Sequence, residues 1–534
     1  MTLPSASYDY VVVGAGSAGA VMASRLSEHP HLSVALVEAG GPDDSAVVQC
    51  PAGLALLPRV KDLTWGFETV PQPGLQGRRG YQPRGKVLGG SSSVNAMIYV
   101  RGHPSDYDDW AAEGNPGWGW QDVLPYFKRA EDNQRGEDEF HGKDGPLHVM
   151  DLLSPHALNE SFIQAGVDAG FSANADFNGP WQEGFGLYQV TQRAGERMSV
   201  AKAYLRPHRS RSNLQVLTKC AAQRIVFEGR RAVGVEVVHQ GRALMLRARR
   251  EVVLSAGAFG SPQLLMCSGV GPADHLRDLG LAVVHDLPGV GAHLHDHIDI
   301  VQVVQAPELT DLFGLSVPGA WRLWQALRQW QRERRGMLTT NFAESGAFIR
   351  SRHEEPRPDL QLHFVIAQLV DHGRQTVWGH GYSCHVCVLR PQSRGQVRLA
   401  SPDPATAPLI DPAFLSHPDD VSRLVRGFQI MRQVLEQPAL ARHGGRESAR
   451  SAWAQTERQI ESFIRQHADT VYHPVGSCRM GPGPMDVVDA ELRVHGLEGL
   501  RVVDASIMPR IVGGNTNAPV VMIAEKASEL MRQA

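Results

Sequence analysis

The sequence has little cysteine, no long apolar run and almost no net charge, and each lack excludes a class of protein. Six cysteines in 534 residues, at unrelated spacings, do not make a disulfide framework and favour a reducing compartment. No window approaches the roughly 18 consecutive apolar residues that a transmembrane helix needs. A formal net charge of −3 gives no electrostatic footprint for nucleic acid. We therefore expect a cytoplasmic globular protein that does not bind nucleic acid.

Length and the first residues narrow this expectation. Residues 1–16 contain neither the basic region nor the long apolar region of a signal peptide. A hydrophobic content of 42% and a charged content of 20% are typical of a globular chain. Because 534 residues exceed one ordinary core, two domains are expected.

Residues 8–40, YDYVVVGAGSAGAVMASRLSEHPHLSVALVEAG, read as strand, glycine turn, helix and second strand. The turn is a G-x-G-x-x-G sequence, and Glu38 ends the second strand, 19 residues after Gly19. Glycines let the backbone approach a pyrophosphate at a helix N-terminus, and the acid binds the ribose hydroxyls. The pattern predicts a bound dinucleotide, in contact with Gly14, Gly16, Ser17, Ala18, Gly19 and Glu38.

The distribution of further strand signals favours FAD over a nicotinamide. Buried-strand patterns occur at residues 10–13, 252–255 and 500–503. A nicotinamide dehydrogenase usually completes its nucleotide domain in one contiguous block, whereas FAD-binding oxidoreductases commonly assemble theirs from distant segments. We therefore expect a discontinuous Rossmann-like domain that binds FAD.

Three longer stretches resemble the signatures of one family, the glucose–methanol–choline oxidoreductases. Residues 85–108 (GKVLGGSSSVNAMIYVRGHPSDYD) are similar to its first signature and residues 257–271 (GAFGSPQLLMCSGVG) to its second. Residues 471–481 (VYHPVGSCRMG) and 502–527 are similar to its C-terminal catalytic segment. The matches are ordered correctly over nearly the whole chain, and they look closest to the bacterial branch of choline and aliphatic-alcohol dehydrogenases.

The resemblance implies two catalytic residues. His473, held in the turn before Pro474, matches the family histidine that accepts the substrate hydroxyl proton while hydride passes to flavin N5. Asn517, in GGNTNAP, is placed at the second position, where its amide would hold the alcohol oxygen.

The resemblance also implies how FAD is held. Some family members tether the flavin through a histidine just before the Asn of SSxxN, but this chain has Val94 there, so FAD is expected to be non-covalent. Pro519 is expected to be the first residue of a final helix whose N-terminus faces the flavin pyrimidine. The remaining contacts implied by the resemblance are Gly89, Gly90, Ser91, Asn95, Ala96, Met97, Ala222 (a departure from the usual Val), Asp504, Ala505, Asn515 and Thr516.

The implied function is oxidation of a primary alcohol to the aldehyde, with a quinone-type electron acceptor. Glu344 is a candidate substrate-binding carboxylate. The alternatives are a choline dehydrogenase, an oxygen-using alcohol oxidase, a hydroxynitrile lyase with bystander FAD, and a flavin-binding protein without turnover.

Two metal-like patterns are interpreted as structural. Cys384 and Cys387 in CHVC lie on a predicted strand, where residues three apart point to opposite faces. His293, His295 and His297 in HLHDH would share one face if extended. Family members carry a similar turn without metal, so no metal site is expected.

Residues 321–338 form a basic helical pattern with two alternative interpretations. Leu323, Trp324, Leu327 and Trp330 share one face, with arginines outside it. Such a helix either covers the substrate domain or contacts the inner face of the cell membrane.

The expected architecture is α/β with two domains. Residues 1–155, 205–300 and 465–534 would form the discontinuous FAD domain. Residues 156–204 and 301–464 would form a substrate domain on a mixed or antiparallel sheet, because residues 360, 362, 364 and 366 alternate on one face and residues 381–401 supply two more strands.

Overall fold

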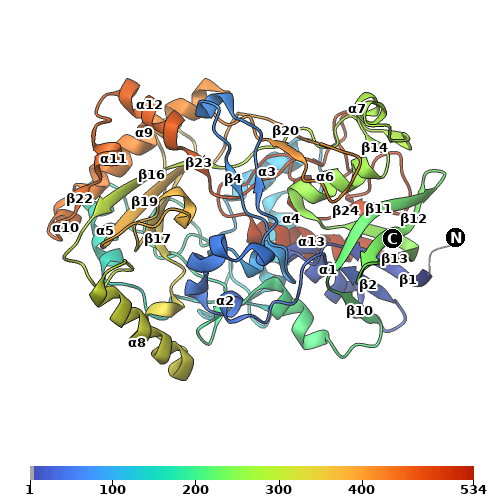
Figure 1. Ribbon diagram of the computed structural model, residues 1–534, viewed down its shortest axis with the longest axis horizontal. Coiled ribbons are helices and arrows are strands. Elements are labelled where there is room, and N and C mark those ends of the chain that lie inside the picture. The colour runs from blue at the N-terminus through green and yellow to red at the C-terminus, as the bar shows by residue number, and fades with distance from the viewer. Residues whose placement is uncertain (1–4, 534) are drawn as a thin grey trace.

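The computed structural model describes residues 5–533, and it contains two large sheets at opposite ends of the molecule (Figure 1). Residues 1–4 and 534, which belong to the predicted FAD domain, lie outside the described part. Helix α13 (Asn517–Gln533) runs beside the first sheet, and α9 (Pro418–Leu435) covers the second. The mixed α/β class expected from the sequence is confirmed.

The first sheet gathers segments from three distant parts of the chain. Strand β1 (Ser5–Val13) pairs in parallel with β2 (Val34–Val37) and with β13 (Arg242–Leu254), and β13 pairs in parallel with β24 (Leu500–Val502). Val11 lies opposite Val252, which lies opposite Leu500, so the three predicted strand signals are neighbours. The sheet is completed by β10 (Leu214–Leu217), β11 (Cys220–Glu228) and β12 (Arg231–His239).

Two helices from opposite ends of the sequence pack together on this sheet. Helix α1 (Ser17–Leu26) follows the first glycine turn and contacts α13. The Arg25 guanidinium donates to the Glu525 carboxylate at 2.8–3.1 Å, and Tyr204 Oη donates to the same carboxylate at 2.6 Å. The C-terminal helix is thereby fixed against the nucleotide half, and it begins at Asn517, two residues earlier than predicted from Pro519.

The second sheet is antiparallel and consists of strands from the middle of the chain. Its order is β22–β16–β19–β18–β17–β7, with β23 beside β16. Helices α5, α9 and α12 cover one face, where Leu360, Leu362 and Phe364 are buried as predicted. The strands are β7 (Gly184–Leu187), β16 (Ile298–Gln305), β17 (Ala343–Ile349), β18 (Leu360–Val365), β19 (Gly381–Val388), β22 (Arg446–Glu447) and β23 (Asp469–Thr470).

One predicted strand lies elsewhere. Of the two strands expected in residues 381–401, β19 joins the second sheet, but β20 (Gln396–Arg398) pairs with β21 (Leu409–Asp411) in a separate ribbon. The chain leaves the large sheet after β19 ends at Val388, and Pro391 cannot donate a backbone hydrogen bond that would extend the ladder. The expected antiparallel sheet is therefore present, but the assignment of β20 to it is wrong.

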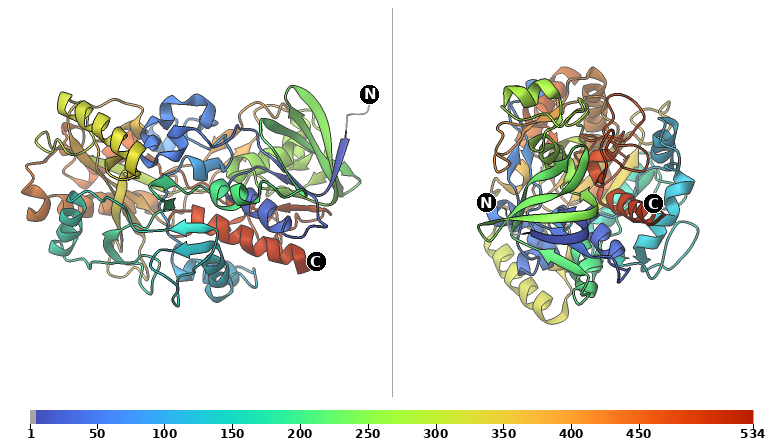
Figure 2. Two further views of the ribbon diagram at one scale, coloured as in Figure 1. Left: turned by 90° about the horizontal axis from the view of Figure 1, so that it is seen from below. Right: turned by 90° about the vertical axis from the view of Figure 1, so that its right-hand side faces the viewer.

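The remaining helices and short strands surround the two sheets (Figure 2). Helix α8 (Val317–Glu333) lies on the outside of the molecule, separated from the first sheet. The others are α2 (Ala46–Gln49), α3 (Pro104–Ala112), α4 (Trp120–Ala130), α5 (Leu158–Asp168), α6 (Gly257–Cys267), α7 (Ala273–Asp278), α10 (Pro438–Ala441), α11 (Ala449–Ala452), α12 (Glu457–His467), β3 (Phe67–Glu68), β4 (Tyr81–Gln82), β5 (Glu131–Asn133), β6 (Leu147–Val149), β8 (Gln192–Arg193), β9 (Glu196–Arg197), β14 (Val270–Gly271) and β15 (His285–Asp286).

The cysteine pair of CHVC is structural. Cys384 belongs to the core under the helices, and Cys387 belongs to a separate core on the opposite face of β19. All six cysteines are free. No helix between residues 5 and 533 is both long and apolar enough to cross a membrane.

Candidate active site

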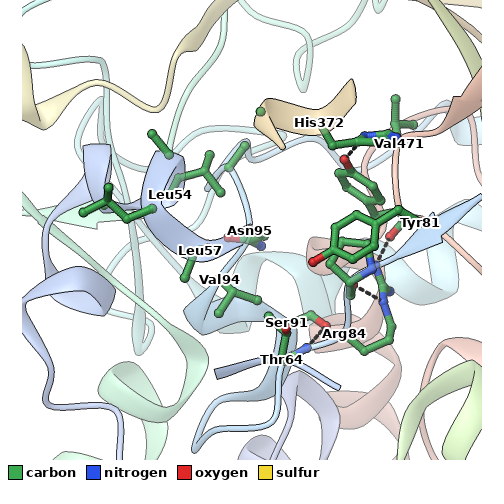
Figure 3. A pocket seen from close by; sticks show the side chains of 18 of the residues that line it. Leu54, Leu57, Thr64, Tyr81, Arg84, Ser91, Val94, Asn95, His372 and Val471 are labelled. Atoms are coloured by element: carbon green, nitrogen blue, oxygen red, sulfur yellow. Dashed lines mark hydrogen bonds between the residues drawn. The ribbon is translucent and has the colours of Figure 1, made fainter. Parts of the chain in front are cut away.

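A cavity of about 1630 Å³ lies between the two sheets and reaches both glycine turns. Drug-sized ligands usually occupy about 300–1,000 Å³, so this space accommodates a large cofactor and a substrate together. Figure 3 shows Leu54, Leu57 and Val94 on one side of the cavity and Tyr81, His372 and Val471 on the other.

The two glycine turns meet at the cavity wall. Gly16 ends the turn after β1, and α1 begins there without a side chain capping its first N–H groups. Gly90, with φ +53°, lies against Gly16, and a Cβ on Gly90 would come within 2.7 Å of the Gly16 Cα. The first N–H groups of α1 therefore have no side-chain partner, and glycine lets a ligand approach the backbone closely. Together these features form an anion site that suits a pyrophosphate.

Glu38 is fixed by the backbone around it. Its carboxylate accepts from Ala15 N at 3.0 Å and from Gly40 N at 2.7 Å. Burial raises the pKa of Glu38 to about 7, although the two backbone N–H groups oppose this shift. The side chain lines the cavity, where ribose hydroxyls can donate to it.

Most of the predicted cofactor contacts line this one cavity. Asp504 is held there by Ser261 Oγ and Ser506 Oγ, each at 2.5 Å. Gly19 packs inward instead, since a Cβ there would lie 1.8 Å from Gly14 O. Gly89 and Pro519 are also not among the lining residues. The predicted contacts that line the cavity are Gly14, Gly16, Ser17, Ala18, Glu38, Gly90, Ser91, Asn95, Ala96, Met97, Ala222, Asp504, Ala505, Asn515 and Thr516.

These residues fit FAD. The turns supply the pyrophosphate site, and Ser255 lines the cavity with a buried Oγ that has no partner in the protein. A buried hydroxyl without a partner is costly, so it marks a place for a polar ligand group. Val94 lines the cavity at the position where a tethering histidine would stand.

His473 is held in the cavity wall by the segment that precedes β16. Its backbone N–H donates to Asp296 Oδ1 at 2.7 Å, and Asp296 Oδ2 accepts from Thr470 Oγ1 at 2.5 Å. Burial lowers the pKa of His473 well below its usual range, and His297, His363 and Arg84 add to that shift. The imidazole is therefore kept neutral, as a proton acceptor must be.

The asparagine that faces His473 is Asn515. Asn515 Nδ2 lies 3.3 Å from His473 Nε2, whereas Asn517 Oδ1 accepts from Ser17 Oγ at 2.7 Å. Asn517 is the first residue of α13, so its side chain turns back toward α1. The prediction that placed Asn517 beside the catalytic histidine is corrected to Asn515, two residues earlier.

The HLHDH segment supports His473, a role that the sequence reading missed. Besides Asp296, His297 Nδ1 lies 3.0 Å from His473 Nδ1, and His295 Nε2 accepts from Ile511 N at 2.9 Å. No cluster of three possible metal ligands exists between residues 5 and 533. The density of histidine and aspartate in this segment was the available signal, and it marked a scaffold for the catalytic turn.

Glu344 lies away from the cavity, so its predicted contact with substrate is wrong. It is 1% exposed and is not among the residues that line the cavity. Its carboxylate accepts from Thr340 Oγ1 at 2.5 Å, His156 N at 2.8 Å and Asn159 Nδ2 at 2.6 Å. Glu344 therefore ties residues 156–159 to β17.

Four carboxylates do line the cavity, and each one is engaged. Glu38 and Asp504 bind backbone and hydroxyl groups in the nucleotide half. At the other end, Asp299 Oδ2 lies 2.6 Å from His385 Nδ1, and Asp469 Oδ2 lies 2.8 Å from His372 Nε2. Each of these two therefore already has a histidine partner.

Helix α8 borders the mouth of the cavity. Trp330 is buried, but the rest of the predicted apolar face is open, with Leu323 48% exposed and Leu327 44% exposed. Leu315 and Trp378 also line the cavity while exposed, which places the opening among these side chains. Packing therefore accounts for only part of the face that the sequence predicted.

Comparison with known proteins agrees with this site. Family models described as GMC oxidoreductase match residues 8–299 and 391–524. An alcohol dehydrogenase (acceptor) of Pseudomonas putida is 47% identical over 527 residues, covering 98% of this chain and 95% of that protein. An oxygen-dependent choline dehydrogenase of Brucella anthropi is 43% identical over 530 residues, with the same coverages. The crystal structure of pyridoxine 4-oxidase from Mesorbium loti aligns with a TM-score of 0.88 and 33% identity, covering 99% of both chains.

Proposed function

The chain belongs to the GMC oxidoreductases, enzymes that act on alcohols, and on that premise we propose that it oxidises neutral primary alcohols, aliphatic or aromatic, to aldehydes. The observation that carries the proposal is the pair formed by His473 and Asn515, which face each other at 3.3 Å in the wall of the FAD-sized cavity. When bound, FAD would supply flavin N5 as the acceptor of the hydride from the carbinol carbon.

The two side chains divide the work on the alcohol oxygen. His473 accepts the hydroxyl proton at Nε2, and burial keeps the imidazole neutral, as a proton acceptor must be. Asn515 Nδ2 donates to the same oxygen as negative charge develops on it. With FAD bound, the alcohol would lose its hydroxyl proton to His473 and a hydride to the cofactor, and this loss of two hydrogens would give the aldehyde.

The walls near His473 favour a neutral substrate. Phe342, Val365 and Leu369 line the cavity there, together with Ala343 and Ala367. A carboxylate without a partner would favour a quaternary ammonium, but Asp299 and Asp469 are each already bonded to a histidine. An apolar wall instead rewards chain length, by about 0.8 kcal/mol for each buried methylene.

FAD would be bound without a covalent link, since Val94 cannot form one. Electrons would pass to a quinone-type acceptor, and the similarity to the alcohol dehydrogenase (acceptor) of Pseudomonas putida supports this. The test is anaerobic reduction of the flavin by choline, 1-butanol, 1-octanol and benzyl alcohol, followed by turnover with oxygen and with a quinone analogue. Preference for choline would contradict the substrate proposal, and equal turnover with oxygen would contradict the acceptor proposal.

The mouth of the cavity supports peripheral contact with an anionic membrane. We define the mouth patch as the exposed leucine and tryptophan side chains of α8 together with Leu315 and Trp378. On α8, Trp321 stacks on Trp324 at 4.9 Å, and Arg328 lies over Trp324 at 4.0 Å. Exposed aromatic groups among arginines suit the boundary between acyl chains and anionic headgroups. The mouth patch consists of Leu315, Trp321, Leu323, Trp324, Leu327 and Trp378.

A further inference from the structure

Six hydrogen bonds form a chain that passes through His473 and ends at two backbone carbonyls. One end is the carbonyl of Leu389, directly after β19, and the other is the carbonyl of Leu362 in β18. A carbonyl oxygen can only accept a hydrogen bond, so each end dictates the direction of donation along its half of the chain.

The first half leads from Leu389 to one side of the imidazole of His473. His297 Nε2 lies 3.0 Å from Leu389 O and must carry the proton. Burial lowers the pKa of His297 to about 4, so its ring is neutral and Nδ1 has a lone pair. His473 Nδ1 lies 3.0 Å from that lone pair and must donate to it. The proton of neutral His473 is therefore on Nδ1.

The second half leads from Leu362 to the other side of the ring. Tyr188 Oη donates to Leu362 O at 2.7 Å, so its oxygen accepts from Gln361 Nε2 at 3.1 Å. The same Gln361 nitrogen donates to Asn515 Oδ1 at 3.0 Å. This fixes the orientation of the Asn515 amide and presents Nδ2 as a donor to His473 Nε2. The lone pair of His473 is therefore on Nε2.

Both halves independently require the same tautomer. We propose that His297 and Gln361 are positioning residues that hold His473 with its proton on Nδ1 and its lone pair on Nε2, facing Asn515. The inference rests on the proposed function, in which Nε2 accepts the alcohol proton. In the opposite tautomer Nε2 would carry a proton, and it could not act as the base.

Among residues 5–533, the ring nitrogens of His473 make hydrogen bonds to His297 and Asn515 and to no other group. The titratable or charged groups that act on it are His297, His363 and Arg84. Its backbone N–H is bound by Asp296, which does not contact the ring nitrogens. The orientation of the proton therefore depends on the chain of hydrogen bonds.

The first test compares two substitutions of His297. His297→Gln keeps one acceptor and one donor group, so it can preserve the direction of donation, whereas His297→Leu removes both. We expect His297→Leu to slow anaerobic flavin reduction by roughly 10–100-fold, as for loss of a residue that orients a reacting group. His297→Gln should recover most of the rate. Equal rates in His297→Leu and the parent would overturn the inference.

The second test substitutes Gln361, in the half of the hydrogen-bond chain that ends at Leu362. Gln361→Leu should slow flavin reduction in the same direction and keep the flavin bound, which makes it the decisive variant if His297→Leu fails to fold. Gln302→Leu is the matched control, because Gln302 is a buried glutamine of the same sheet outside the chain of hydrogen bonds. Slowing by the control as large as that by Gln361→Leu would show a packing effect and overturn the inference.

A direct readout does not depend on turnover. Solid-state ¹⁵N spectra of histidine-labelled protein, with His473→Asn to assign the resonance, should show His473 protonated on Nδ1 in the parent. His297→Leu should shift the population toward the Nε2–H form. An Nε2–H parent would overturn the inference even if alcohols reduce the flavin. A parent with the Nδ1–H form whose flavin no alcohol reduces would overturn the proposed function alone.

Discussion

Gly16 and Gly90 come from different glycine turns, and their backbones lie against each other. A Cβ on Gly90 would lie 2.7 Å from the Gly16 Cα, which is too close. A Cβ on Gly16 would lie 4.0 Å from the Gly90 Cα, which is an ordinary contact distance. The asymmetry arises because a Cβ on Gly90 would point at the backbone of the other turn, whereas a Cβ on Gly16 would point past it toward the cavity that both glycines line. A side chain on Gly16 would therefore occupy space that a ligand needs, whereas a side chain on Gly90 would disrupt the fold.

This relationship predicts different outcomes for two glycines of the same motif. Gly16→Ala should fold with a melting temperature near that of the parent apoprotein but bind FAD weakly, because the methyl group enters the ligand space. Gly19→Ala should misfold, since its Cβ would lie 1.8 Å from Gly14 O. Thermal melting and FAD titration measure both effects, and unchanged FAD affinity in Gly16→Ala would contradict the assignment.

Substitutions of Asn515 and Asn517 should also differ in their effect on the rate of flavin reduction. His473→Ala should keep FAD and slow anaerobic flavin reduction by roughly 10²–10⁴-fold. Asn515→Ala should slow it by a smaller factor, because it removes one hydrogen bond to the alcohol oxygen. Asn517→Ala is the control, since it loses only the bond from Ser17 Oγ. A larger rate loss in Asn517→Ala than in Asn515→Ala would restore the original assignment.

The sequence predicted the elements whose signals are local. The glycine turn, the acidic end of β2 and the three strand segments are contiguous patterns, and the structure brings them into one sheet. The sequence could not distinguish Asn515 from Asn517, because the direction of each side chain depends on where α13 starts. It also could not show that Glu344 faces residues 156–159, since that contact spans 185–188 positions of the chain. The spacing of residues along the sequence does not predict which side chains meet when they are far apart in the chain.

The flavin should leave the denatured protein. Val94 lines the cavity and has no atom that can bond covalently to a flavin ring. Acid precipitation should therefore release the yellow colour to the supernatant, with one FAD per chain by absorbance. Colour that stays in the pellet after washing would contradict a non-covalent cofactor.

Acid should destabilise the protein through His363. Burial lowers the pKa of His363 to about 3, and its Nδ1 has no partner in the protein. Below the unfolded pKa near 6.5 the unfolded chain binds the extra proton, so stability from this group is present above pH 6.5 and lost as pH falls. The loss is at most about 1.4 kcal/mol per pH unit.

Substitution isolates that contribution. The melting temperature of His363→Gln should fall less between pH 7 and pH 5 than that of the parent, because the variant has no such proton to bind. His31→Gln, at an exposed position, is the control and should follow the parent. Parallel declines in the parent and His363→Gln would show that this histidine does not titrate on unfolding.

The mouth patch predicts binding to anionic vesicles at low salt. Reversing the charge of Arg322, Arg328 and Arg332 to Glu should abolish most of it, since each arginine near such a surface contributes about 1 kcal/mol. Reduction of the flavin by a water-soluble alcohol should be kept, because these arginines lie outside the catalytic pair. The control reverses Arg230 and Arg242, which are exposed on the nucleotide half.

Apolar contact should matter as well as charge. Trp321→Ser combined with Trp324→Ser removes a stacked pair that is largely exposed, so it should weaken vesicle binding without lowering the melting temperature. Co-sedimentation with vesicles of anionic and of neutral lipid measures both contributions. Parent protein that ignores anionic vesicles at low salt would refute membrane contact, and the open face of α8 would then have to be explained by another partner.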